Sequence, residues 1–323
     1  MISDGNSKKF SYPAQLGILF GLLGGGLLVA SMVSGIIWMV WTGRSIFALQ
    51  TELTNPEYYY QVMVIQGVST LFIFLIPVLA FAAICYRKVD LFLGTRTPFS
   101  NKQILLIIAL LVISFPLGGA LAEINQIIPI PHSWELKFKE WEAAREQQEA
   151  ALIKIDSLGK YLMSMVMIAI LPAIFEEFFF RGGLQNLLTR WMGGAVGAII
   201  LTSVIFSAFH GSYYGFLVRL ALGVILGYIY YLSGSIWLSA LFHFLFNGVQ
   251  VTALYLFRES ENINSKDIEQ NFPIWSGAIA LILLIWVFSV FKKESDKMKP
   301  AFSAHPSEDP ELLTDFDDQY QGH

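Results

Sequence analysis

The sequence predicts an all-α, polytopic membrane bundle of about eight transmembrane helices. Of its 323 residues, 55% are hydrophobic and only 14% are charged, whereas a soluble domain carries about 25% charged residues. The mean hydropathy is +0.56. Uncharged runs of about 18 residues or more, long enough to cross a bilayer, recur along the chain. These observations exclude a soluble globular protein, a disordered chain and a disulfide scaffold.

Residues 1–291 are expected to form a single membrane domain. The first uncharged run lies between Lys9 and Arg44, and it is longer than the 7–15 apolar residues of a signal peptide. We therefore interpret it as a retained signal anchor. The apolar stretch 191–232 is divided at Gly211-Ser212, which is a soft break, so a different division of this stretch stays open. The expected helices occupy residues 14–41, 60–86, 103–122, 161–181, 194–210, 213–232, 235–257 and 273–291.

Two segments fall outside these spans. Residues 134–156 mix Trp134, Leu136 and Trp141 with dense charge, which is typical of an amphipathic helix on the membrane surface. A plain solvated helix explains the same pattern, and both interpretations stay open. The C-terminal tail, 292–323, has basic residues followed by acidic ones among prolines and serines, a composition that predicts disorder.

The distribution of basic residues predicts the orientation of the bundle. With an even number of spans and the N-terminus inside, the inner segments hold most lysines and arginines, as the positive-inside rule requires. Both termini are therefore expected in the cytoplasm. The single cysteine, Cys85, allows no intrachain disulfide. The inner basic residues are Lys8, Lys9, Arg87, Lys88, Arg96, Lys102, Arg190, Lys292, Lys293, Lys297 and Lys299.

The stretch from Tyr161 to Leu256 concentrates the informative residues. Each charge at the centre of a bilayer costs roughly 2.5–3.5 kcal/mol or more, so such residues face a protein interior or a wet cavity and are functional candidates. Peptide hydrolysis in a membrane needs a general base, an oxyanion donor and a water-filled cavity. The ionisable residues of this stretch are Glu176, Glu177, Arg181, Arg190, Arg219, His210 and His243.

The first cluster is a pair of glutamates followed by an arginine. Glu177 and Arg181 are four residues apart and share one face of a helix, so we expect an ion pair between them. Glu176 points about 100° away and is free to meet another partner, which makes it the candidate general base. The alternative is a structural ion pair near headgroup water.

Two further clusters each contain a histidine. Phe206 precedes His210 by four residues, and His243 precedes Asn247 by the same spacing. His243 and Asn247 thus place two donors on one helix face, an arrangement that can hold a developing oxyanion. Ordinary hydrogen bonds between helices are the alternative for each histidine. Estimated helix lengths place Glu176 and His210 at the same depth in the membrane but His243 closer to its connecting turn. A common site is therefore compatible with the spacing and not required by it.

The three clusters, Glu-Glu-x-x-x-Arg, Phe-x-x-x-His and His-x-x-x-Asn in that order, resemble the CPBP family. This family comprises type II CAAX prenyl endopeptidases and bacteriocin-processing, Abi-type intramembrane proteases. The resemblance covers roughly 160–260, the expected protease core. It implies that Glu176 activates water with the help of His210 and that His243 and Asn247 form the oxyanion hole. It also implies that Glu177 and Arg181 hold the site together.

The resemblance leaves the cofactor open. The family is often called metalloprotease, but a glutamate-dependent reaction without metal has also been proposed for it. Zinc could take Glu176, His210 and His243 as ligands, with one position left for water. No His-Glu-x-x-His motif is present, and asparagine is a poor zinc ligand. We therefore favour a reaction that requires no metal.

The resulting hypothesis is a membrane endopeptidase that acts on membrane-associated peptides or proteins, with prenylated CAAX-type substrates as one candidate class. A non-catalytic scaffold or bacteriocin-immunity protein and a proton-coupled transporter are the competing classes. The expected partners are membrane lipid and a peptide or protein substrate, since a net charge of −4 gives no attraction to nucleic acid. The lack of a glycosylation signal or an ER-retention tail favours a bacterial cytoplasmic membrane. The oligomeric state is unknown.

Overall fold

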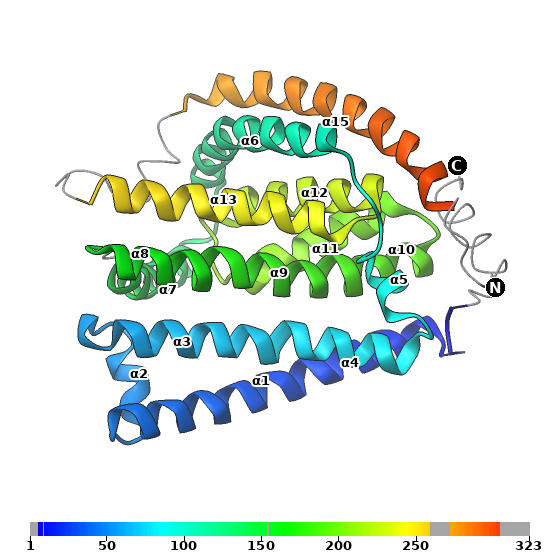
Figure 1. Ribbon diagram of the computed structural model, residues 1–323. Coiled ribbons are helices and arrows are strands. Elements are labelled where there is room, and N and C mark those ends of the chain that lie inside the picture. Colours follow the sequence, from blue (N-terminus) through cyan, green and yellow to red (C-terminus); the bar gives the residue numbers. More distant parts are fainter. Residues whose placement is uncertain (1–5, 9, 154, 259–271, 304–323) are drawn as a thin grey trace.

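The computed structural model describes residues 6–8, 10–153, 155–258 and 272–303, and it is an all-α membrane bundle (Figure 1). Seven helices within these ranges are long and apolar enough to cross a bilayer. The eighth expected span is the shorter apolar helix Ala195–Phe209. At ~1.5 Å per residue its 15 residues extend about 22 Å, less than the ~30 Å of a hydrocarbon core.

The helices follow one another with short connections. The first half of the chain forms α1 (Tyr12–Thr42), α2 (Ala48–Glu52), η1 (Pro56–Tyr58), α3 (Tyr59–Thr70), η2 (Leu71–Leu75), α4 (Ile76–Cys85), α5 (Val89–Leu93), α6 (Asn101–Ile127) and α7 (His132–Ile153). The second half forms α8 (Leu158–Ser164), η3 (Met165–Ile170), α9 (Leu171–Glu177), η4 (Phe178–Gln185), α10 (Asn186–Met192), α11 (Ala195–Phe209), α12 (Phe216–Ser233), α13 (Ile236–Leu256) and α15 (Ile274–Ser303).

Two expected boundaries were wrong. The fourth span was expected to end at Arg181, but the helix continues without interruption to Met192. The charge of Arg181 does not end it, because the side chain is buried and paired with Glu177. The tail was expected to be disordered from residue 292, but α15 extends to Ser303. The remainder of the predicted disordered tail, 304–323, lies outside the described residues.

Proline explains two of the three π-helical segments. The segments η2 and η3 end two residues before Pro77 and Pro172. Proline has no N–H and cannot complete the regular i→i−4 ladder, so the backbone widens locally. The third segment, η4, begins directly after Glu177 and contains the buried pair Gly182-Gly183.

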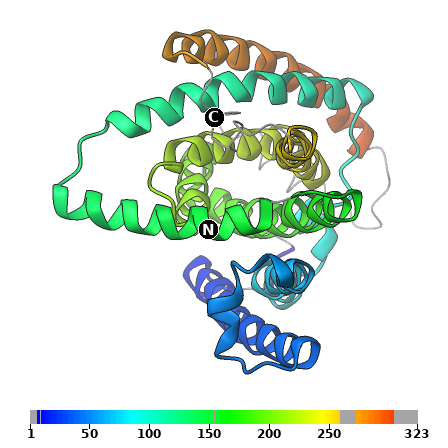
Figure 2. The same cartoon turned by 90° about the vertical axis from the view of Figure 1, so that its left-hand side faces the viewer.

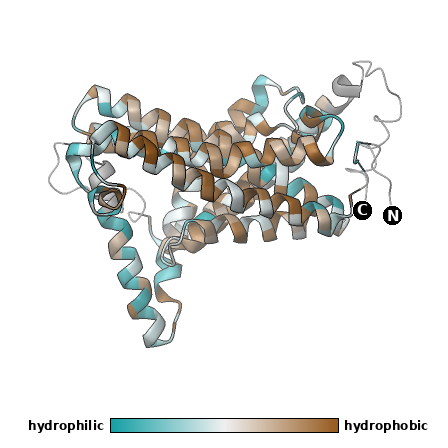
Figure 3. Ribbon diagram, turned by 90° about the horizontal axis from the view of Figure 1, so that it is seen from below, coloured by the Kyte–Doolittle hydropathy of each residue, from teal (hydrophilic) through white to brown (hydrophobic). Residues whose placement is uncertain are grey.

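The bundle has three layers in Figure 1, with α1 and α3–α4 on one side, α6 and α15 on the other, and α8–α13 between them. One apolar core joins the first layer to the middle, and a second joins the middle to α6 and α15. Figure 3 shows hydrophobic residues along the lengths of the helices and hydrophilic residues mainly at their ends and on α7. Exposed apolar side chains such as Leu28, Val40 and Ile282 on the outer helices suit contact with lipid.

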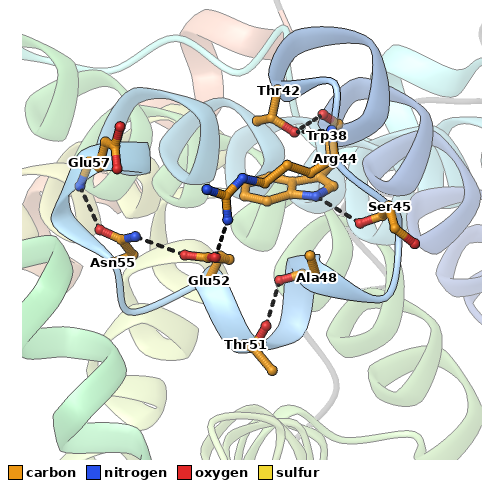
Figure 4. Close-up of polar contacts among 9 residues, drawn as sticks. All are labelled: Trp38, Thr42, Arg44, Ser45, Ala48, Thr51, Glu52, Asn55 and Glu57. Atoms are coloured by element: carbon orange, nitrogen blue, oxygen red, sulfur yellow. Dashed lines mark hydrogen bonds and ion pairs between the residues drawn. The ribbon is translucent and has the colours of Figure 1, made fainter.

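Polar contacts define the two ends of the bundle. At one end, the turn after α1 is closed by the Arg44–Glu52 ion pair and by a 2.8 Å hydrogen bond from Asn55 to Glu52 (Figure 4). At the other end, the amide of Lys8 donates to the carbonyl of Cys85 at 2.8 Å. The start of α6 and the last turns of α15 also meet there, through Gln103 and Ser295 at 3.0 Å. The start of α1 and the end of α15 therefore lie at the same end of the bundle.

We expect Gly26→Val to destabilise the fold. A Cβ at Gly26 would lie 2.2 Å from the backbone oxygen of Phe72, which cannot move away without shifting η2. Overpacking of this kind costs about 1–3 kcal/mol. The measurement is the melting temperature in detergent, with Gly25→Val as the matched control because a Cβ there meets nothing within 4 Å. Equal melting temperatures for the two variants would contradict this packing.

Candidate active site

A single buried carboxylate connects two of the three clusters. Oε1 of Glu177 lies 2.9 Å from Nη1 of Arg181 and 3.0 Å from Nδ1 of His243. The side chains of Glu177 and Arg181 are completely buried, and that of His243 is 8% exposed. The expected Glu177–Arg181 ion pair is therefore present. Its carboxylate also anchors α13 to α9, which brings His243 to the depth of the glutamates.

The guanidinium of Arg181 reaches two further helices. Its Nη2 donates to the carbonyl of Gly223 on α12 at 3.2 Å. Its Cζ lies 4.7 Å from the ring centroid of Phe206 on α11, a distance at which a cation is attracted to the ring face. Gly223 permits this close packing, because a Cβ there would lie 2.8 Å from the Cβ of Ser203 on α11. Arg181 thus fixes the positions of α11 and α12 around the site.

His210 is placed by the end of α11. Its Nδ1 lies 2.8 Å from the carbonyl oxygen of Phe206, and since a carbonyl only accepts, Nδ1 carries the proton and Nε2 of the neutral ring keeps its lone pair. The helix ends here because Gly211 adopts a left-handed conformation with φ of 63°. The ring of Phe206 contacts both imidazoles, with centroid distances of 4.8 Å to His210 and 6.0 Å to His243.

Glu176 faces away from the ion pair but remains close to it. Its carboxylate is within electrostatic reach of His243, Glu177 and Arg181. Within the described part of the chain, its Oε2 atom is buried and has no hydrogen-bond partner. A buried polar atom without a partner is uncommon and calls for an explanation, such as a catalytic role. Oε2 of Glu177 is likewise buried without a partner, but its Oε1 is bound by Arg181 and His243, so Glu176 is the acidic group better placed to act on a bound molecule.

Asn247 has a partner that the sequence pattern did not reveal. Its Nδ2 donates to the backbone oxygen of Ile168 at 3.3 Å. In a regular helix this oxygen would accept from residue 172, which is proline and has no N–H. The Asn247 amide supplies a donor at this position, so it has a structural role in addition to any catalytic one.

The possible zinc ligands do not form a metal site. Among the described residues, no group of three or more His, Cys, Asp or Glu side chains is arranged to hold a metal ion. Nδ1 of His243 is engaged by Glu177 and Nδ1 of His210 by a carbonyl. These contacts leave Nε2 of both rings open, as in many metal-ligating histidines, so it is the lack of such a group among the described residues that gives no zinc site in this arrangement. No step of the reaction below uses a metal.

The sequence-predicted residues thus meet, but not all in the same way. Glu177, Arg181 and His243 are in direct contact, and Glu176 and His210 lie around them. Asn247 follows one turn after His243 on α13. The sequence analysis missed the roles of two other groups, the Phe206 ring and the Gly223 carbonyl. Phe206 was visible as the first residue of Phe-x-x-x-His, whereas nothing in the sequence indicated Gly223.

The family model described as Type II CAAX prenyl endopeptidase Rce1-like matches residues 158–249. This segment is Rce1-like. It includes every predicted site residue from Glu176 to Asn247, and the match confirms the resemblance seen in the three motifs. At the level of the family it supports a CAAX-type intramembrane endopeptidase. No significant match is found among curated proteins or among solved structures.

In the Rce1-like segment, Arg181→Ala should lower thermal stability strongly. The substitution leaves the Glu177 carboxylate buried without its cation, and breaking such a pair costs about 3–5 kcal/mol. The measurement is thermal unfolding in detergent. Arg96→Ala is the control, since Arg96 pairs with Asp90 but is 74% exposed and should contribute little. An unchanged melting temperature for Arg181→Ala would show that the pair does not stabilise the fold.

Proposed function

We propose that this integral membrane protein is an endopeptidase that hydrolyses peptide bonds of membrane-associated peptides or proteins, with Glu176 as the base that activates water. One observation carries the proposal: in the Rce1-like segment, Glu176 has a buried carboxylate oxygen without a partner beside the Glu177–His243 pair. A membrane protein gains no stability from such a group, so its presence favours a chemical role.

The proposed reaction begins with proton transfer from water to Glu176. The water oxygen attacks the carbonyl carbon of the scissile peptide, and the carbonyl oxygen becomes the oxyanion of a tetrahedral intermediate. The proton held by Glu176 then passes to the leaving nitrogen as the C–N bond breaks. The products are a carboxylic acid and an amine, which become a carboxylate and an ammonium when the acid proton passes to the amine, and Glu176 returns to its starting state. The free Nε2 of His210 accepts a hydrogen bond from the attacking water and orients it.

The proposed oxyanion hole consists of His243 and Asn247. Glu177 holds Nδ1 of His243 and so orients the ring, and in the proposed reaction an N–H at Nε2 of this ring donates to the oxyanion. Asn247 contributes the second N–H of its amide, since only one is engaged by Ile168. Arg181 balances the charge of Glu177, so that this carboxylate supports His243 without becoming a second base.

An apolar groove next to the site suggests what kind of substrate enters. It has a volume of about 390 Å³ and lies along α13 against Met165. Phe244 and Gly248, the neighbours of His243 and Asn247, line it together with Val249 and other apolar residues. We propose that this groove accepts the apolar part of a membrane-associated substrate. A prenyl group is the candidate indicated by the family description.

We further propose that the protein lies in a bacterial cytoplasmic membrane with both termini in the cytoplasm. The start of α1 and the end of α15 lie at one end of the bundle (Figure 1). The basic residues expected inside also belong to this end, in the connections after α4, before α6 and at the end of α15. This distribution satisfies the positive-inside rule.

The decisive measurement is cleavage of a panel of prenylated and plain peptides by the purified protein in detergent, followed by mass spectrometry. Glu176→Gln should abolish cleavage, because the amide cannot take a proton from water. Glu123→Gln, an exposed glutamate on α6, is the control and should cleave normally. Full activity in Glu176→Gln would reject Glu176 as the base, and no cleavage by folded wild-type protein would favour a scaffold or transporter.

Asn247→Ala should reduce turnover about 10²–10³-fold, the usual loss for one oxyanion donor. It also removes the donor to the Ile168 carbonyl, so a second variant separates the two roles. Pro172→Ala introduces a backbone N–H that can bond this carbonyl. If Asn247 acts on the oxyanion, the double variant stays as slow as Asn247→Ala. Recovery of wild-type turnover in the double variant would show that Asn247 serves only the helix.

A further inference from the structure

The turn that carries His210 is held from outside the Rce1-like segment. It comprises residues 210–215 and connects the short helix α11 to α12. It follows a helix that extends only about 22 Å, less than the ~30 Å of a hydrocarbon core. Figure 2 looks along the bundle from this end and shows α7 running across it and extending sideways beyond the other helices.

The turn is shaped by contacts within it and with the adjoining ends of α11 and α12. The N–H of Gly215 donates to Oγ of Ser212 at 3.1 Å, and Oγ of Ser207 donates to the carbonyl of Phe216 at 2.7 Å. Gly211 has a positive φ, and a Cβ at Gly215 would lie 2.2 Å from Nη1 of Arg219. These contacts set the local shape of the turn, but they do not fix it against the rest of the bundle.

The end of α6 fixes one side of the turn. The side chain of Asn125 is almost completely buried. Its Nδ2 donates to the carbonyl of Tyr213 at 2.9 Å, and its Oδ1 accepts from the N–H of Leu217 at 2.9 Å. One asparagine therefore binds both the turn and the first turn of α12, which gives these two segments a common reference.

Helix α7 fixes the other side. Oγ of Ser212 donates to Oε2 of Glu142 at 2.9 Å, and Glu142 also forms an ion pair with Arg145. The ring of Phe138 stacks on that of Tyr213 with a centroid distance of 4.7 Å and an interplanar angle of 2°. Burial raises the pKa of Glu142, but the hydrogen bonds from Arg145 and Ser212 and the charges of Arg145 and Arg219 together lower it by more, so that its pKa lies below the ordinary value. Glu142 is therefore a carboxylate at neutral pH.

These contacts are selective within α7. Glu142 is 8% exposed, whereas Trp134 and Trp141 on the same helix are about half exposed at 49% and 54%. The Glu142–Arg145 ion pair is also close to the candidate catalytic residue His210, which lies within electrostatic reach of both Arg145 and Arg219. The buried face of α7 at Glu142 is thus directed at the His210 turn.

We infer that Glu142 is a positioning residue for His210, acting through the Ser212 hydroxyl, and that α7 is the element that holds the catalytic turn in place. This inference rests on the proposed peptidase function. It assigns a role to residues 132–153, which precede the Rce1-like segment. Loss of the contact would let the turn, and with it the His210 ring, move relative to Glu176. A displacement of about 1 Å in a catalytic group can cost up to 10²-fold in rate.

The test compares kcat, KM and melting temperature for Glu142→Ala, Glu142→Gln and Glu140→Ala in the full-length protein. Glu142→Ala should lower kcat by up to about 10²-fold with KM and melting temperature unchanged, because substrate binding does not involve the turn. Glu142→Gln should recover most of kcat, since its amide oxygen can still accept from Ser212. Glu140→Ala is the matched control, because Glu140 is exposed and its side chain points about 200° away on the same helix.

Hydrogen–deuterium exchange provides a second readout that needs no substrate. In Glu142→Ala, the backbone amides of residues 207–217 should exchange faster, while those of α13 stay unchanged. Normal kcat and normal exchange in Glu142→Ala would overturn the inference. A loss of kcat that follows a fall in melting temperature, or that Glu140→Ala reproduces, would also overturn it. Failure of the proposed function gives a different result, namely no cleavage by wild-type protein.

Discussion

The arrangement of the middle layer depends on the carboxylate of Glu177. Burying two charges in an apolar bundle costs several kcal/mol per ion unless their partners are close and well aligned. Glu177 meets this condition by pairing with Arg181 on its own helix and with His243 on α13. Arg181 in turn binds Gly223 and covers Phe206. Four helical segments therefore have fixed positions relative to one carboxylate, and the same group orients the imidazole proposed to act in catalysis.

The backbone near the site is irregular for identifiable reasons. Pro172 removes a helical donor in front of the glutamates, and a π-helical segment follows Glu177 directly. Such segments often occur at functional sites because they leave carbonyls and side chains in positions that a regular helix does not allow. In the π-helical segment before Pro172, η3, the carbonyl of Ile168 binds the amide of Asn247. The irregularity of one helix thus determines where a candidate catalytic residue on another can point.

The Rce1-like segment is less than a third of the chain, but its site is not self-contained. Residues that precede it provide Asn125 and Glu142, which hold the turn with His210 on two sides. Helix α6 also packs along α15, so the last spanning helix indirectly supports the same turn.

The sequence alone determined the fold class and the approximate spans, because long uncharged runs have few alternatives to a membrane helix. It also identified the Glu177–Arg181 pair, since four-residue spacing on a helix has one geometric meaning. Whether His243 joins these residues was undetermined, because depth estimates from helix lengths do not include how far each helix projects. Only the tertiary structure decided this, together with the partner of Asn247 and the contact between α7 and the turn. Each of these links residues more than 60 positions apart, and no local pattern encodes such a distance.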